Sequence, residues 1–156
     1  MKATRLPALL LTMLAFGALG YVVTQLWYFD LPPLPSFAPV SLLLLTILEL
    51  GMARVVRDKV RGRSGGRPMH PIQVARAAVL AKASSLGASM LAGLYGGIFL
   101  WTFLRRDTYA TAGDDARTAG LSALTALLLV VAALLLERAC RTPEPPEPDP
   151  APRVGS

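Results

Sequence analysis

The sequence predicts an all-α integral membrane protein with four transmembrane helices in two antiparallel hairpins. Of its 156 residues, 53% are hydrophobic and only 17% are charged. The mean hydropathy of +0.48 is more than a soluble core of this size requires. Three stretches of about one membrane span contain no charge, and a fourth contains a single carboxylate. The short remainder leaves no room for a separate soluble catalytic domain.

We expect the first span at residues 6–29. These 24 residues contain no charge, and at about 1.5 Å per residue they exceed the roughly 30 Å hydrocarbon core. A cleaved signal peptide is the alternative, since Lys2 and Arg5 precede the run and residues 18–20 resemble a cleavage site. The apolar run continues well past that site, which favours a retained anchor.

The next two spans are separated by a basic connection. Prolines at residues 30–39 remove backbone donors and end the first helix. The second span, at residues 39–56, carries Glu49 and ends among arginines and lysines. The third span, at residues 78–104, belongs to a longer helix that starts at Pro71, a residue suited to a first helical turn. That helix overshoots the membrane, so its first turns should project at the inner interface.

The fourth span covers residues 118–136, which contain no charge and follow a polar connection at residues 105–117. The four spans together predict a membrane domain over residues 1–137. Residues 138–156 are rich in proline and glutamate, with little to bury, and predict a disordered cytosolic tail.

The distribution of cations predicts the orientation. With the N-terminus inside, the inner segments carry 13 lysines and arginines and the outer segments carry three, which favours cytosolic N- and C-termini. Trp27 and Trp101 then fall at the outer ends of their spans, as aromatic anchors do. A pI near 10.1 could suggest nucleic acid, but the cations crowd the ends of apolar runs. The lipid bilayer is therefore the expected partner, and nucleic acid is not.

Small residues recur at four-residue spacing in the third span. Such a row lets another helix approach closely in lipid, where dispersion and backbone contacts replace the hydrophobic effect. Packing within the monomer and self-association both fit this pattern. The predicted helix-packing residues are Ser85, Ser89, Gly93 and Gly97.

Glu49 is the most suggestive single residue, because a carboxylate within an apolar run is costly and is a candidate for function. The alternative is a structural role, either solvated at the inner interface or paired with Arg76 or Lys82 of the third helix. Lys82 marks the inner end of the third span, and its flexible stem can reach a partner. We therefore predict an intramembrane ion pair between Glu49 and Lys82; without one, the carboxyl would take up a proton.

The remaining residues predict no enzyme, no cofactor and no metal. There is no Ser/His/Asp set, no pair of intramembrane carboxylates and no glycine-rich nucleotide fingerprint, so no catalytic residue is assigned. The single Cys140 excludes an internal disulfide and a cysteine zinc cage. His70 has no other metal-type ligands near it in the sequence.

Several short segments, in this order and spacing, resemble the actinobacterial membrane-protein family catalogued as domain of unknown function 3180. They lie at residues 49–54, 70–76, 81–84, 112–117 and 140–144. The resemblance covers nearly the whole chain. It implies a small multi-span protein of the bacterial plasma membrane without an established activity, and it supplies no catalytic residues.

These observations favour a non-enzymatic membrane protein that packs against or positions a membrane partner. The alternative is a small homo-oligomeric transporter or channel subunit that uses Glu49 as an ion-coupling group. A transporter normally lines its path with several polar groups, whereas the second span offers chiefly Glu49 and Thr46.

Overall fold

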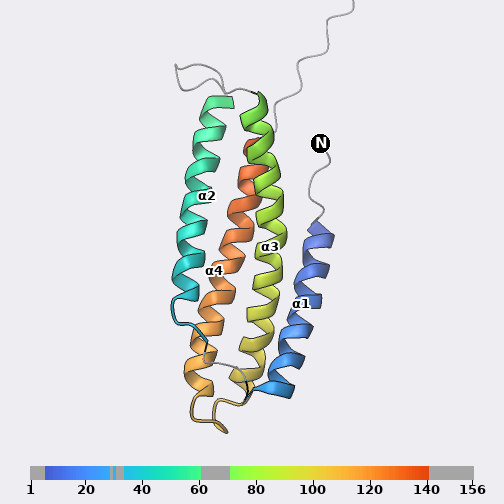
Figure 1. Ribbon diagram of the computed structural model, residues 1–156, viewed down its shortest axis with the longest axis vertical. Coiled ribbons are helices and arrows are strands. Elements are labelled where there is room, and N and C mark those ends of the chain that lie inside the picture. The colour runs from blue at the N-terminus through green and yellow to red at the C-terminus, as the bar shows by residue number, and fades with distance from the viewer. Residues whose placement is uncertain (1–5, 29, 31–33, 61–70, 141–156) are drawn as a thin grey trace, which may run out of the picture.

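The computed structural model describes residues 6–28, 30, 34–60 and 71–140. It contains four helices, each long and apolar enough to cross a membrane, and no strand occurs within the described ranges. The predicted all-α fold with four membrane-spanning helices is therefore confirmed. In chain order, the helices are α1 (Leu6–Trp27), α2 (Ala38–Val60), α3 (Pro71–Leu104) and α4 (Ala112–Ala139) (Figure 1).

The helices extend beyond the predicted spans. Helix α3 begins at Pro71 as expected and has 34 residues, or about 51 Å at 1.5 Å per residue. Helix α4 begins six residues before the predicted span, with Asp114 and Asp115 in its first turn, where carboxylates interact favourably with the helix dipole. It ends at Ala139, so the membrane domain reaches slightly past residue 137. The rest of the predicted tail, residues 141–156, lies outside the described residues.

Helices α3 and α4 form the centre of the bundle as an antiparallel hairpin. Helix α1 packs chiefly on α3, and α2 packs chiefly on α4, so α1 and α2 lie on opposite sides of the central pair (Figure 1). The first two helices are thus antiparallel in direction but are separated by the second hairpin. Each outer helix runs parallel to the central helix on which it packs.

The two ends of the bundle differ in their side chains. At one end, α1 and α3 begin while α2 and α4 finish; we call this the basic end, after its exposed cations. At the other end, Tyr28, Trp101 and Tyr109 cluster between α1, α3 and the start of α4. We call this the aromatic end. Helix α2 begins short of it (Figure 1).

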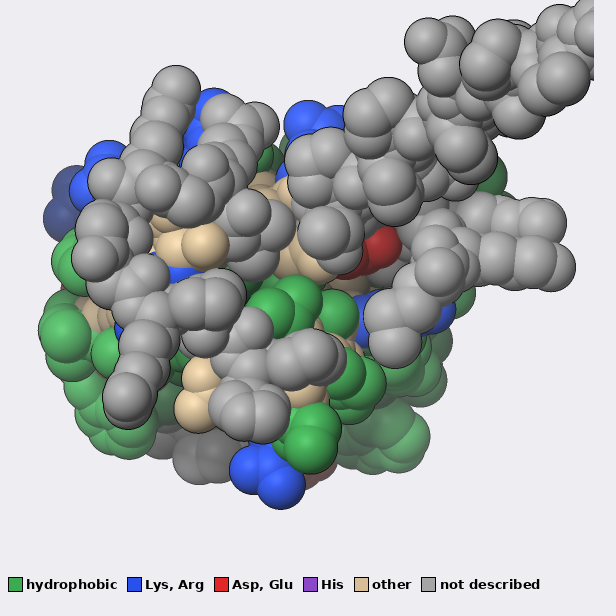
Figure 2. Space-filling view, turned by 90° about the horizontal axis from the view of Figure 1, so that it is seen from above, with side chains coloured by type: hydrophobic (Ala, Val, Ile, Leu, Met, Phe, Trp, Pro, Cys, Tyr) green, Lys and Arg blue, Asp and Glu red, His purple; other side chains and the backbone are tan. Residues whose placement is uncertain are grey.

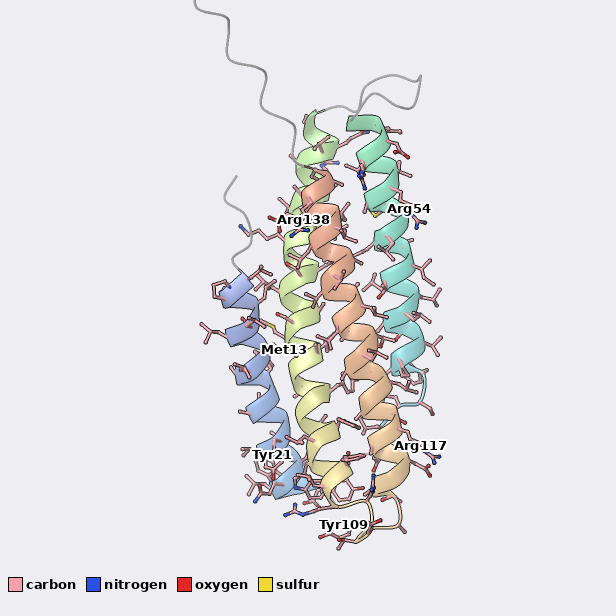
Figure 3. The ribbon with its side chains drawn as sticks, turned by 180° about the vertical axis from the view of Figure 1, so that it is seen from behind. Met13, Tyr21, Arg54, Tyr109, Arg117 and Arg138 are labelled. Carbon is pink, nitrogen blue, oxygen red and sulfur yellow. The ribbon has the colours of Figure 1, made fainter. Side chains whose placement is uncertain are left out.

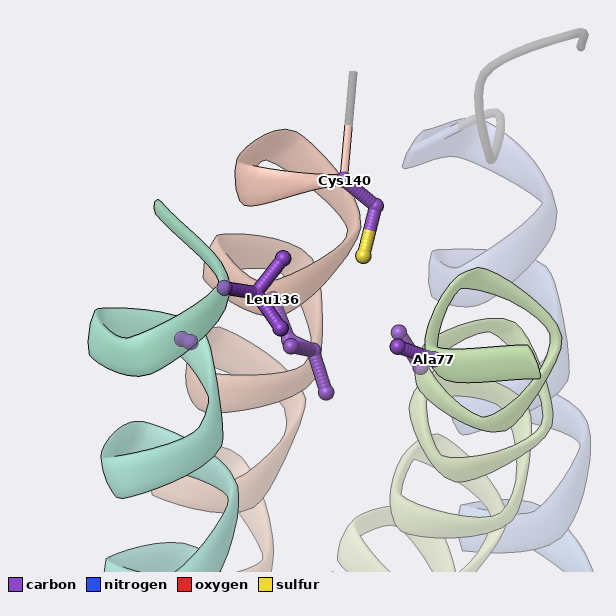
Figure 4. Close-up of a cluster of buried hydrophobic side chains, with 6 residues drawn as sticks. Ala77, Leu136 and Cys140 are labelled. Atoms are coloured by element: carbon purple, nitrogen blue, oxygen red, sulfur yellow. The ribbon is translucent and has the colours of Figure 1, made fainter. Parts of the chain in front are cut away.

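A small apolar core joins α2, α3 and α4 at the basic end. Ala77, Leu136 and Cys140 point toward one another there (Figure 4). Small side chains allow α2 and α3 each to pack closely on α4, and Leu136 of α4 fills the space between α2 and α3. The buried members of this core are Ala53, Val56, Ala77, Ala81, Leu136 and Cys140.

Candidate functional site

Two glycines of the predicted packing row form the contact between α3 and α1. A Cβ atom added at Gly93 would meet the carbonyl oxygen of Met13 and, at 3.0 Å, the backbone nitrogen of Gly17. A Cβ atom added at Gly97 would meet the Gly17 carbonyl oxygen and, at 2.7 Å, the nitrogen of Tyr21. Met13 and Tyr21 mark this stretch of α1 in Figure 3. The two backbones touch here, and only glycine permits the approach.

The two serines of the row point elsewhere around α3. Ser85 and Ser89 are buried, and their hydroxyls donate to the carbonyls of Lys82 at 2.9 Å and Leu86 at 2.7 Å. Four residues turn a helix by about 400°, so a row at this spacing rotates by about 40° at each step. Ser85 therefore points about 120° away from Gly97. The row covers two faces of α3, and its glycines are the part that contacts α1.

Glu49 lies at the midpoint of α2, and only 2% of it is exposed. Its carboxyl group makes a side-chain hydrogen bond with Ser84 of α3. Its Oε2 atom is buried and finds no hydrogen-bond partner among the described residues. Thr46 is also buried, but its hydroxyl donates to the Leu42 carbonyl of its own helix at 2.8 Å. The carboxyl group thus has one polar partner and one oxygen without any.

The structure does not bring Glu49 and Lys82 together as the ion pair that the sequence predicts. Lys82 is exposed, and the two ion pairs found among the described residues both lie at the aromatic end of the bundle. Lys82 follows Ala81, which is fully buried, and one residue turns a helix by about 100°. The lysine side chain therefore points away from the packed face. Ser84 occupies the position that the prediction gave to Lys82.

The register of α1 against α3 places Glu49 near one boundary of the apolar layer. Gly17 lies level with about residue 95 of α3, between the two glycines that it contacts. Leu6, 11 residues earlier in a parallel helix, therefore lies level with about Ser84. Because Ser84 is the partner of Glu49, the carboxyl group lies level with the beginning of α1, although α1 and α2 are on opposite sides of the bundle.

Three aromatic rings connect α1, α3 and α4 at the aromatic end. The ring of Tyr28 lies 4.6 Å from Trp101 and 5.7 Å from Tyr109, and Trp101 stacks on Tyr109 at 6.0 Å. The Tyr28 hydroxyl donates to Oδ2 of Asp115, in the first turn of α4, at 2.8 Å. Burial raises the pKa of the Tyr28 phenol, and the neighbouring Asp115 carboxylate raises it further. This cluster fixes the end of α1 to both central helices.

The two tryptophans at this end have different surroundings. Trp27 is 54% exposed, as an aromatic anchor at a membrane interface should be. Trp101 is only 3% exposed, with the Arg105 guanidinium 4.6 Å from its ring centroid. The sequence predicted an anchor at both positions, but the structure buries Trp101 in the ring cluster. Position along the chain cannot tell which side of a helix faces its neighbours.

Exposed cations surround the basic end. In the view onto this end, lysine and arginine side chains lie around the rim, above the hydrophobic sides of the helices (Figure 2). Cys140 lies in the apolar core beneath; burial raises the pKa of its thiol, and the charge of Glu137 raises it further. The thiol therefore stays protonated and weakly nucleophilic. The described exposed cations of this end are Arg54, Arg57, Lys59, Arg76, Lys82 and Arg138.

The described residues bring no metal-binding set together. No group of three or more His, Cys, Asp or Glu side chains occurs among them. His70, which the sequence considered and set aside, lies outside the described residues. The polar features that the structure does assemble are the buried contact of Glu49 with Ser84 and the rim of cations at the basic end.

Fold and composition together define a membrane protein with four apolar helices. Residues 9–144 match the family described as Protein of unknown function (DUF3180), so the chain belongs to this family. The resemblance in the sequence is thereby confirmed over most of the chain. Comparisons with curated proteins and with solved structures give no match.

Proposed function

We propose that this chain is a non-enzymatic, multi-pass protein of the bacterial plasma membrane that positions a partner protein at the cytosolic face. Its N- and C-termini lie in the cytosol in this proposal. The support for this orientation is the imbalance of 13 lysines and arginines on the basic-end side against three on the other. The basic end then faces the cytosol.

The observation that carries the proposal is a projection at the basic end. Because Leu6 lies level with about Ser84, the part of α3 from Pro71 onward extends about 20 Å past the beginning of α1. The end of α2 runs beside it, held by the core that joins Ala53 and Ala77. We call residues 54–60, 71–83 and 137–140 the basic projection.

The basic projection presents apolar as well as charged side chains. Val55 and Ile72 are exposed, although they lie beyond the level at which α1 begins. In this proposal, Val55, Ile72 and the cations around them form the surface that contacts the partner. The glycines of the small-residue row are already used against α1. We therefore place the partner contact on the projection and not on the row.

Purification in mild detergent tests this proposal. The wild type is compared with Arg57→Gln/Lys59→Gln/Arg76→Gln and with the charge-preserving control Arg57→Lys/Lys59→Arg/Arg76→Lys. We expect one reproducible co-purifying protein, reduced at least tenfold in the neutral variant and retained in the control. Equal recovery in all three, or co-purification of anionic lipid without any protein, contradicts the proposal.

A homo-oligomeric transporter or channel subunit is the second candidate, and the burial of Glu49 favours it. The hydroxyls of the other buried residues weaken it, because Thr46, Ser85 and Ser89 donate to carbonyls of their own helices. With their protons donated to the backbone, these hydroxyls offer no free donor to a transported group. Ion flux into vesicles that contain the purified protein, lost in Glu49→Gln, would favour this candidate over the first.

A further inference from the structure

The second polar feature, the contact between Glu49 and Ser84, carries an inference that is independent of the partner. Only 2% of Glu49 is exposed, and its Oε2 atom has no hydrogen-bond partner among the described residues. A buried carboxylate without a cation and with a single hydroxyl partner is strongly destabilised by the loss of hydration. The site therefore requires a positive ligand.

The ionisable groups nearby do not supply that charge. Helix α2 offers Arg54, α3 offers Lys82, and α4 offers Glu137, Arg138 and the thiol of Cys140. Both arginines and the lysine are exposed, and neither ion pair among the described residues includes Glu49. Glu137 is itself acidic, and the Cys140 thiol is protonated. None of these three cations is buried beside the carboxyl group.

A metal ion does not fit the site either. Calcium requires several oxygen ligands, whereas the one hydrogen-bond partner of the Glu49 carboxyl group among the described residues is Ser84. At the level of Ser84, the buried residues that α3 and α4 contribute are largely alanines. The proton is the one cation that a single carboxyl group binds without further ligands.

The geometry points to Glu49 as a proton-binding site where its buried carboxyl group meets Ser84 of α3. With its proton bound, the carboxyl group is neutral and keeps its hydrogen bond to Ser84. Without the proton, the carboxylate must be hydrated, and α2 separates from α3 at this level.

Infrared spectroscopy of the protein in lipid tests the inference directly. A protonated carboxyl group gives a C=O stretching band that is separate from carboxylate bands and shifts in D₂O. At neutral pH, we expect the difference between wild type and Glu49→Gln to contain one such band. It should fall as the pH is raised, while a carboxylate band rises. A difference spectrum with only carboxylate bands at neutral pH overturns the inference.

Two variants keep the test independent of folding. Glu49→Gln preserves the shape and neutrality of the bound state, so it should melt within a few degrees of the wild type at neutral pH. Ser84→Ala removes the hydrogen-bond partner and should shift the carboxyl band of Glu49 to a higher frequency, while Ser85→Ala should not. A Ser84→Ala band identical to that of the wild type would contradict the assigned contact. These readouts need no partner, so they are unaffected if partner capture fails.

Discussion

The two outer helices are held to the central pair by different chemistry. Helix α1 contacts α3 through glycine backbone, where Gly17 lies between Gly93 and Gly97. Helix α2 is held by alanines, by Leu136 and by the buried carboxyl group of Glu49. A backbone contact depends on the absence of a side chain, whereas a carboxyl contact depends on a proton. We therefore expect α1 to be a fixed part of the bundle, whereas the packing of α2 should depend on the protonation of Glu49.

The largest expected effect comes from filling the glycine contact. Gly93→Ala adds a Cβ atom against the Met13 carbonyl oxygen and should cost about 2–3 kcal/mol, since the two backbones must separate. Gly87→Ala is the matched control, because a Cβ atom there meets nothing within 4 Å. Thermal unfolding in detergent measures both. Equal stability of the two variants would show that α1 is not held by backbone contact.

A smaller effect is expected where the end of α1 meets the aromatic cluster. Tyr28→Phe removes the hydrogen bond to Asp115 and should cost about 1 kcal/mol, the usual net value of such a bond. Tyr95→Phe, which changes a tyrosine within α3 and away from this cluster, should cost less. The comparison by detergent melting shows whether α1 depends on a polar clamp in addition to its glycines. A larger loss from Tyr95→Phe would contradict the assigned role of Tyr28.

The same phenol predicts a pH dependence. Burial raises the pKa of Tyr28 above its usual value of 10.0, so folding favours the protonated phenol. Its contribution is present below the unfolded pKa and is lost as the pH rises through the folded pKa, above about 10. Tyrosinate absorbance measures this: the component missing in Tyr28→Phe should titrate above 10. A missing component at or below 10 would exclude the buried, hydrogen-bonded phenol.

The smallest expected effect concerns whether Glu49 of α2 is paired with Lys82 of α3. Because Lys82 points away from Glu49, Glu49→Gln and Lys82→Met should act independently, with a coupling energy below about 0.5 kcal/mol. A double-mutant cycle by detergent melting measures it. If the double variant recovers more stability than that value, Glu49 and Lys82 form an ion pair. Glu49 would then need no bound proton.

The sequence was sufficient for the features that depend on composition along the chain. Three charge-free runs and the apolar run around Glu49 located the four helices, and Pro71 marked the beginning of α3 because proline suits the first turn. The glycine spacing identified a close helix contact. The packing order of the helices was not predictable, because all four are apolar on several sides and lipid supplies no hydrophobic effect to choose between neighbours.

The site was predictable only in part. Glu49 stands out as the one carboxylate in its run, but a hydroxyl such as Ser84 gives no signal among many small residues. Lys82 was predicted as the partner because of its charge and its position along the third span. The turn of about 100° from the buried Ala81 places its side chain on another face of α3. The burial of Trp101 was missed for the same reason.

The orientation of the bundle is the central claim, since the proposed partner contact requires the basic end to face the cytosol. Reporter fusions after Asp30, Gly65, Thr108 and Ser156 measure it directly. With the basic end in the cytosol, the reporters are expected to read outside, inside, outside and inside. A reporter after Ser156 that reads outside would contradict this orientation, because the basic projection would then face away from the cytosol.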